Sequence, residues 1–201
     1  MKERNDRSRI YLLRHGSTEA VEKGIIYGKL DVPVSDKGFA DLDEYKEKRV
    51  YANINAKNFI TSGMLRTKQT LECIFGVVDS YVIEDLSERD YGSYEGTTVN
   101  NLSSSCRFYL AWTDGELNNG DERLKGMEAL KCYRARVLSG FNQLWEKHMN
   151  SYGDTVAILH HGSISNIMSA LFSEYEDVYI GPGRGFEIRI IGSKVLGYSE
   201  V

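Results

Sequence analysis

The 201-residue sequence has only three cysteines, and they lie far apart at Cys73, Cys106 and Cys132. No Cys-x-x-Cys pair is present, so the set argues against a disulfide framework and against a four-cysteine zinc site. Scattered cysteines of this kind are typical of core or surface positions. We therefore expect reduced thiols and a cytoplasmic protein.

The sequence also lacks a long apolar run and an excess of basic residues. Residues 1–9 are polar and charged with no apolar stretch behind them, which argues against a secretory signal. No run approaches the ~18 apolar residues of a membrane span. The 25 basic and 29 acidic residues give a formal net charge of -4, which argues against nucleic-acid and membrane partners. A few converging arginines can still bind a small anionic substrate.

Proline is scarce as well, with two residues, and no repeat or low-complexity tract provides a candidate linker. Hydrophobic residues at 41% and charged residues at 27% are typical of a globular protein. A chain of this length can bury a core in one unit. We expect a polar tail over residues 1–9 and a single domain over residues 10–201.

Short apolar runs alternate along the chain with segments of helical periodicity. The runs predict strands at residues 10–13, 59–60, 81–86, 155–159, 186–191 and 195–198. Helical spacing predicts helices after Ser35, before Phe75, over residues 103–112 and 127–148, and after Gly162. This alternation favours an α/β fold: a three-layer α/β/α sandwich with a mostly parallel central sheet.

Three of the predicted strands end in a polar tripeptide. The tripeptides are Arg14-His15-Gly16, Thr61-Ser62-Gly63 and His160-His161-Gly162. Because ligands bind at the carboxyl ends of parallel strands, we expect these side chains to converge on one edge of the sheet. The fourth histidine of the chain, His148, lies near a predicted helix end, where a histidine can stabilise the helix through its dipole.

This mixture of residue types suits phosphoryl transfer. The transferred group spreads charge over three equatorial oxygens, so catalysis is mostly positioning and electrostatic stabilisation. Guanidinium groups stay protonated and donate paired hydrogen bonds to phosphate oxygens. Neutral imidazole is a good nucleophile near pH 7, and a carboxylic acid is needed to protonate the departing oxygen.

Four blocks of the sequence, in this order, resemble the histidine phosphatase superfamily, which includes cofactor-dependent phosphoglycerate mutases and α-ribazole phosphatases. Residues 13–18 carry the Arg-His-Gly signature. Residues 62–70 resemble the Ser-Pro-x-x-Arg-x-x-x-Thr segment, residues 86–96 the acidic motif, and residues 156–162 the strand with the second His-Gly pair. The resemblance implies a phosphoglycerate mutase-like fold.

The resemblance also implies roles for individual residues. His15 is expected to attack phosphorus and become phosphorylated. Arg14 and Arg66 are expected to bind the phosphoryl oxygens, and Gly16 lets backbone N–H groups approach the anion. Metal ligands and cofactors are not expected, since the His160-His161 doublet lacks the i, i+4 spacing of a helical zinc pair.

The remaining two roles fall to Glu88 and one histidine of the doublet. Glu88 is expected to protonate the leaving group and later to activate water, with Glu95 as a second choice. The family's His-Gly pair assigns charge stabilisation on the phosphoryl group to His161. His160 then becomes a supporting or packing residue, because only one of two strand neighbours faces the site.

Two positions depart from the family pattern. Val21 stands where the family often has an asparagine that binds phosphate, and Gly63 replaces the proline before Arg66. Neither change removes a reacting group.

We expect a phosphomonoester hydrolase acting on a small phosphorylated metabolite, as a monomer or homodimer. Mutases carry several basic residues after the acidic motif, whereas residues 95–122 here contain a single basic residue, Arg107. Phosphoglycerate mutase-type phosphoryl transfer remains an alternative, because the Tyr91-Gly92 pair is similar to the corresponding segment of the mutases. A non-catalytic binding module on the same fold is a second alternative. The candidate contacts to the leaving group are Tyr94, Arg107, Tyr109 and Trp112.

Overall fold

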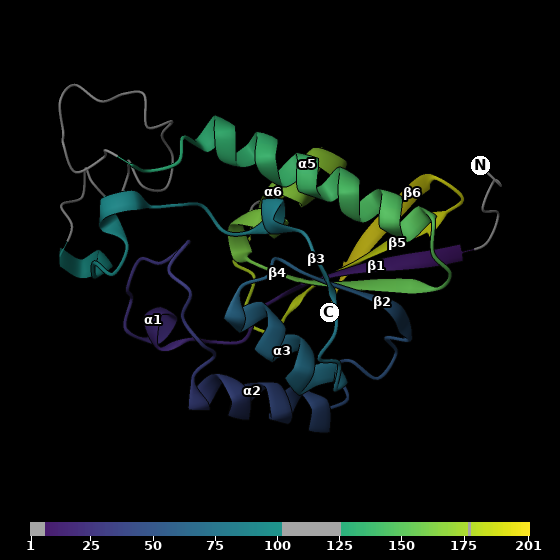
Figure 1. Ribbon diagram of the computed structural model, residues 1–201. Coiled ribbons are helices and arrows are strands. Elements are labelled where there is room, and N and C mark those ends of the chain that lie inside the picture. Colours follow the sequence, from purple (N-terminus) through teal and green to yellow (C-terminus); the bar gives the residue numbers. More distant parts are fainter. Residues whose placement is uncertain (1–6, 102–125, 177) are drawn as a thin grey trace.

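The computed structural model describes residues 7–101, 126–176 and 178–201. Its centre is a six-stranded sheet in the order β3-β2-β4-β1-β5-β6 (Figure 1). The strands are β1 (Arg7–Arg14), β2 (Ala56–Thr61), β3 (Tyr81–Val82), β4 (Asp154–Leu159), β5 (Gly185–Ile191) and β6 (Lys194–Glu200). The pairings among β1 to β4 are parallel, whereas β5 and β6 are antiparallel to their neighbours. The α/β fold with a mostly parallel sheet is confirmed.

Helices cover both faces of this sheet. Figure 1 shows α2 (Asp36–Glu47) and α3 (Leu65–Phe75) on one side, and α5 (Leu130–Met149) and α6 (His161–Leu171) on the other. The connections contain the short helix α1 (Glu19–Glu22) and the 3-10 turns η1 (Glu84–Leu86), η2 (Gly92–Tyr94) and η3 (Val99–Asn101). Within the described residues, no helix is both long and apolar enough to cross a membrane.

The two faces of the sheet bury separate hydrophobic clusters. In β4, Ala157 and Leu159 pack in the cluster on the α5 and α6 side, and Val156 and Ile158 pack in the cluster that also contains Leu71 of α3. Every residue of β4 is buried. A strand covered on both faces has an unbroken apolar run rather than an alternating pattern.

The amino-terminal strand begins earlier than expected. β1 starts at Arg7, inside the tail predicted over residues 1–9, and pairs with β5 from Arg7 opposite Ile191 onwards. Ser8 is buried and hydrogen-bonds His148, which also bonds Thr155 at 2.9 Å. His148 therefore connects the end of α5 to β1 and β4, in addition to lying at the helix end.

Two other boundaries also differ from the prediction. The strand expected over residues 81–86 stops at Val82 and continues as η1, and the long helix begins at Leu130 rather than near residue 127. The helix predicted over residues 103–112 lies outside the described residues, as does Cys106. Cys73 and Cys132 are free thiols.

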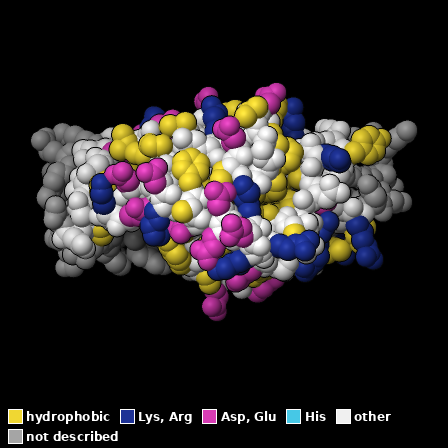
Figure 2. Space-filling view, turned by 90° about the horizontal axis from the view of Figure 1, so that it is seen from below, with side chains coloured by type: hydrophobic (Ala, Val, Ile, Leu, Met, Phe, Trp, Pro, Cys, Tyr) yellow, Lys and Arg dark blue, Asp and Glu magenta, His cyan; other side chains and the backbone are white. Residues whose placement is uncertain are grey.

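The surface on the α2 side carries charges of both signs. Figure 2 shows acidic and basic side chains spread over this face. Along α2, Lys37 pairs with Asp41 and Lys46 with Asp43. Exposed pairs of this kind contribute little to stability.

Candidate active site

The three polar tripeptides meet at one edge of the sheet because their strands are neighbours. β4 lies between β2 and β1, with Leu159 opposite Arg14 and Ile158 opposite Thr61. The residues that follow these strands therefore lie side by side. The His15 backbone N–H extends the ladder by donating to Leu159 O at 3.0 Å.

His15 is buried, with 3% of its surface exposed, and has a defined tautomer. Its Nδ1 lies 2.7 Å from Gly16 O. Because a carbonyl only accepts, Nδ1 carries the proton and Nε2 keeps its lone pair. Burial, followed by the guanidinium groups of Arg66 and Arg14, holds the pKa of His15 well below its ordinary value. The imidazole is therefore neutral at pH 7, as a nucleophile must be.

His160 packs against His15 with their ring centroids 5.2 Å apart. Its Nδ1 accepts a hydrogen bond from Arg66 Nε at 3.4 Å, so its Nε2 carries the proton and donates to Ser62 Oγ at 2.8 Å. The side chain is fully buried. Burial, Arg66, His15 and Arg14 hold the pKa of His160 well below its ordinary value.

His161 contacts Ile180 and Tyr179, the two residues that also contact Arg14. It is the first residue of α6, its Nδ1 accepts from the Ile180 backbone N–H at 3.5 Å, and its ring lies 5.9 Å from that of Tyr179. Strand alternation gives the two histidines different neighbours. Val156 and Ile158 face the α3 side of the sheet, and His160 continues that parity toward Arg66 of α3. His160 therefore contacts the ring of His15 from the α3 side of the sheet.

Arg66 is a buried guanidinium held by uncharged groups. It is fully buried, its Nη2 donates to Gly28 O at 2.6 Å and its Nη1 to Leu30 O at 3.0 Å. The guanidinium also lies 4.9 Å from the ring centre of Tyr27. No carboxylate among the described residues forms an ion pair with it, and burial lowers its pKa. A buried cation without a paired anion favours an anionic ligand.

Arg14 is the second buried guanidinium, with 7% of its surface exposed. Its Nη1 donates to Ile180 O at 2.6 Å, and the ring of Tyr179 lies 5.3 Å from the guanidinium carbon. Its Nε is buried without a hydrogen-bond partner among the described residues. An unpaired buried donor beside His15 fits an oxyanion site.

Glu88 is held by three donors from three parts of the chain. Oε1 accepts from the Tyr133 hydroxyl at 2.6 Å and from the Arg89 backbone N–H at 2.9 Å. Oε2 accepts from the Gly162 backbone N–H at 3.1 Å. The charge of Glu88 acts on both Arg66 and Tyr27, so the carboxylate belongs to the same cluster.

Glu95, the second choice for the acid, has a different task. Its carboxylate accepts from the backbone N–H groups of Gly28, Lys29 and Leu30 at 3.0 Å, and from that of Tyr91 at 3.1 Å. It thereby fixes the loop whose carbonyls bind Arg66. Its oxygens are occupied by this scaffold.

The backbone N–H of Gly16 has a partner within the protein. The N–H donates to Thr70 Oγ1 at 2.8 Å. A Cβ at position 16 would lie 2.8 Å from Leu42 and 3.2 Å from Val34. A larger residue here would require the Leu42 side chain of α2 to shift.

The two departures from the family pattern are accommodated locally. Val21 lies in α1, and its N–H donates to Thr18 Oγ1, which caps that helix. Gly63 has φ +87, a conformation that proline cannot adopt. Of the candidate leaving-group contacts, Tyr94 is buried with 4% exposure, and Arg107, Tyr109 and Trp112 lie outside the described residues.

Sequence reasoning did not single out Tyr27 and Tyr133. The ring of Tyr27 lies 6.3 Å from that of His15 and also packs on Arg66. Tyr133 falls three residues after Leu130 and four before Val137, so it lies in the apolar stripe of α5. A hydroxyl-bearing side chain within an apolar stripe is the signal that could have found it.

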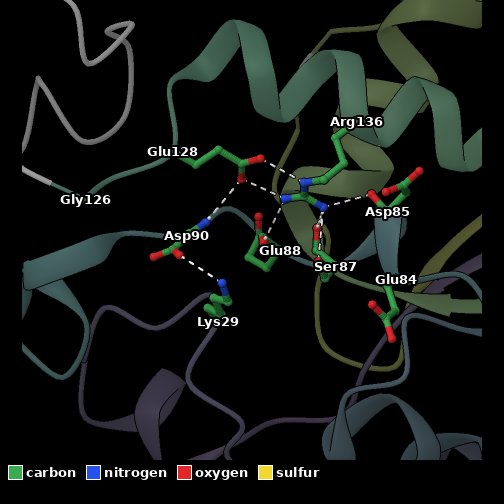
Figure 3. Close-up of a pocket in the computed structure, with 9 residues that line it drawn as sticks. All are labelled: Lys29, Glu84, Asp85, Ser87, Glu88, Asp90, Gly126, Glu128 and Arg136. Atoms are coloured by element: carbon green, nitrogen blue, oxygen red, sulfur yellow. Dashed lines mark hydrogen bonds and ion pairs between the residues drawn. The ribbon is translucent and has the colours of Figure 1, made fainter.

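A pocket of about 450 Å³ borders Glu88 on the α5 side (Figure 3). Lys29 pairs with Asp90 at 3.5 Å, and Arg136 pairs with Glu128 at 2.7 Å. Over residues 7–101, 126–176 and 178–201, no group of three His, Cys, Asp or Glu side chains is arranged to hold a metal ion.

Comparison with known proteins places these features in a family context. The model of the histidine phosphatase superfamily (branch 1) matches residues 10–181. "Putative phosphoserine phosphatase 2" of Hydrogenobacter thermophilus is 25% identical over 174 residues, which cover 81% of this chain and 78% of that protein. The 2,3-bisphosphoglycerate-dependent phosphoglycerate mutase of Mesorhizobium japonicum is 25% identical over 171 residues, covering 81% and 80%.

Solved structures share the fold at lower identity. A phosphoglycerate mutase from Bacillus anthracis superposes with a TM-score of 0.80 at 16% identity, covering 98% of this chain and 93% of that one. Phosphoglycerate mutase from Thermus thermophilus superposes with a TM-score of 0.66 at 21% identity, covering 94% and 97%.

Proposed function

The chain belongs to branch 1 of the histidine phosphatase superfamily, and we propose that it hydrolyses a small phosphomonoester through a phosphohistidine at His15. One observation carries this proposal. His15 is held neutral, with its Nε2 lone pair available, beside two buried guanidinium groups that lack carboxylate partners among the described residues. This arrangement combines a nucleophile with a binding site for a phosphoryl group.

In the first step, His15 Nε2 attacks phosphorus and the bond from phosphorus to the leaving oxygen breaks. Arg14 and Arg66 bind the equatorial oxygens, where negative charge accumulates. Glu88, as the carboxylic acid, gives its proton to the departing oxygen, so the products are an alcohol and phospho-His15.

In the second step, water attacks phosphorus and the N–P bond breaks. Glu88, now a carboxylate, takes the proton from the attacking water. Inorganic phosphate is released, His15 recovers its lone pair and Glu88 regains its proton, which closes the cycle.

We assign the charge-stabilising role on the phosphoryl group to His161, as the family's His-Gly pair implies. Its Nδ1 accepts from the Ile180 backbone N–H, so its Nε2 carries the proton that a phosphoryl oxygen can accept. His160 supports the site, because its nitrogens bond Arg66 and Ser62 and its ring contacts His15.

Hydrolysis is favoured over phosphoryl return to a second acceptor. A mutase must bind a further anionic group of its substrate, and near Glu88 the cations Lys29 and Arg136 are already paired with Asp90 and Glu128. The mutase remains the second candidate because relatives of that name are as similar to this chain as the phosphatase. The cytoplasmic location, the lack of nucleic-acid and membrane partners, and a monomeric or homodimeric state stay predictions of the sequence.

The test is incubation of the purified chain with p-nitrophenyl phosphate and, separately, with 3-phosphoglycerate. We expect inorganic phosphate from the first, insensitivity to EDTA, and acid-labile phosphate on the protein after rapid quenching. His15→Ala should abolish turnover and labelling. Fast isomerisation of 3-phosphoglycerate would favour the mutase. The absence of both phosphate release and isomerisation would contradict the proposal.

A further inference from the structure

The carboxylate of Glu88 accepts a hydrogen bond from Tyr133, whose hydroxyl also contacts Ser163. Tyr133 lies in the first turn of α5 and is buried, with 3% exposure. Its hydroxyl donates to Glu88 Oε1 at 2.6 Å and lies 3.2 Å from Ser163 Oγ of α6. Ser163 Oγ in turn donates to Leu86 O at 2.9 Å. The phenol therefore has a single orientation, set by two helices and the loop before Glu88.

The phenol keeps its proton at the pH values of enzyme assays. Burial, and then the nearby Glu88, raise the pKa of Tyr133 well above its ordinary value. Since the hydroxyl stays protonated, it is a permanent donor to the carboxylate.

Gly162 closes the remaining side of this contact. A Cβ at position 162 would lie 2.6 Å from Glu88 Oε1 and 2.7 Å from the Tyr133 hydroxyl. The carboxylate and the phenol therefore fill the space beside the Gly162 backbone. This close approach is the physical reason for glycine after the two histidines.

Arg136, one turn further along α5, fixes the backbone that carries Glu88. Its Nη1 donates to Asp85 O at 2.9 Å and Ser87 O at 3.2 Å. Figure 3 shows this side chain reaching from α5 to the loop, paired with Glu128. Its guanidinium also lies 5.2 Å from the ring centre of Tyr133. One helix face thus holds both the backbone and the carboxylate of the same segment.

We propose that Tyr133 is a positioning residue for proton transfer by Glu88, fixing the carboxylate in the orientation from which it reaches the leaving oxygen. This inference rests on the proposed function. Proton transfer requires the acid within hydrogen-bond reach of the departing oxygen, and small misplacements have large effects on rate. Without the phenol, only the backbone N–H groups of Arg89 and Gly162 hold the carboxylate, so its orientation is less firmly fixed.

Tyr133→Phe tests the proposal because it keeps the ring and removes the donor. Substrates should be compared across leaving groups, from p-nitrophenyl phosphate to phenyl phosphate and β-glycerophosphate. We expect kcat/KM, which reports the steps up to release of the alcohol, to fall less than ~3-fold for p-nitrophenyl phosphate, which needs little protonation, and at least ~10-fold for β-glycerophosphate. A merely structural role would lower kcat/KM equally for all substrates.

Two further variants keep the test decisive if Tyr133→Phe folds poorly. Gly162→Ala presses on both the carboxylate and the phenol and should show the same steeper dependence on leaving group. Tyr11→Phe, which removes a hydroxyl buried in the opposite core cluster, is the matched control and should leave the dependence unchanged.

The outcomes separate this inference from the proposed function. An unmodified chain that hydrolyses none of these esters contradicts the phosphatase itself. An active chain whose Tyr133→Phe and Gly162→Ala variants keep the original dependence on leaving group contradicts the positioning role alone.

Discussion

His160 and His161 are neighbours of the same type whose surroundings give them different tasks. His160 forms hydrogen bonds with Ser62 and Arg66, and its ring contacts that of His15. His161 accepts a hydrogen bond from the backbone of Ile180. Ile180 O also accepts from Arg14. Each histidine of the doublet is therefore linked to a different arginine of the site.

Alanine substitutions at both positions test this division. His161→Ala should lower kcat/KM on p-nitrophenyl phosphate by roughly 10²-fold, the effect of losing one group that stabilises a transition state. His160→Ala, the matched control, should lower it by less than about tenfold. An equal or larger loss at His160 would contradict this division of roles.

Sequence reasoning found candidate residues in motifs of fixed spacing, and the structure brings His15, Arg14, Arg66 and Glu88 into one cluster. Within the doublet, the family's His-Gly pair selects His161, because His160 is followed by a second histidine and not by glycine. Sequence reasoning could not decide the use of Gly16. A glycine beside a nucleophile suits anion binding or close packing, and the deciding contact comes from Leu42 in a different element.

Among the elements, the segment after β3 shows why an apolar pattern can mislead. Tyr81 and Val82 pair with the end of β2, and Ile83 N–H makes the last bond, to Thr61 O at 2.9 Å. The partner strand ends there, so η1 follows. Ile83 and Leu86 are still buried, which gives the segment the composition of a strand. By contrast, β4 (Asp154–Leu159), whose residues are all buried between two partner strands, was predicted to within one residue as 155–159.

The turn from β2 into α3 offers a prediction at this scale. Gly63 has φ +87, and a Cβ there would lie 2.8 Å from Val82. Gly63→Pro should therefore destabilise the fold by more than about 1 kcal/mol, although the family pattern has proline here. The stability of Gly63→Ala should lie between that of the unmodified chain and that of Gly63→Pro. Urea denaturation measures the order, and an unchanged midpoint for Gly63→Pro would contradict the assigned backbone conformation.

At the scale of the whole molecule, two buried neutral histidines link folding to pH. His15 and His160 have pKa values well below that of an unfolded histidine, with burial as the first cause. Between the folded and unfolded pKa, the unfolded chain binds protons that the folded chain does not. The stability that the two neutral histidines contribute is therefore fully present above pH ~6.5 and is lost as the pH falls below this value.

We expect the free energy of unfolding to decrease by up to roughly 1.4 kcal/mol per pH unit for each histidine below that point. Urea denaturation at about pH 7.5, 6 and 5 measures the slope. His15→Asn should reduce it, since one of the two linked groups is gone. A stability that is flat across this range would show that neither histidine is held neutral by the fold.

The burial of Arg14 and Arg66 without acidic partners among the described residues has a consequence for how the protein responds to its surroundings. A tetrahedral oxyanion that neutralises them binds the folded chain only, and so raises the melting temperature in proportion to the logarithm of its concentration. Orthophosphate, the product of the proposed reaction, would then act as both thermal protectant and competitive inhibitor.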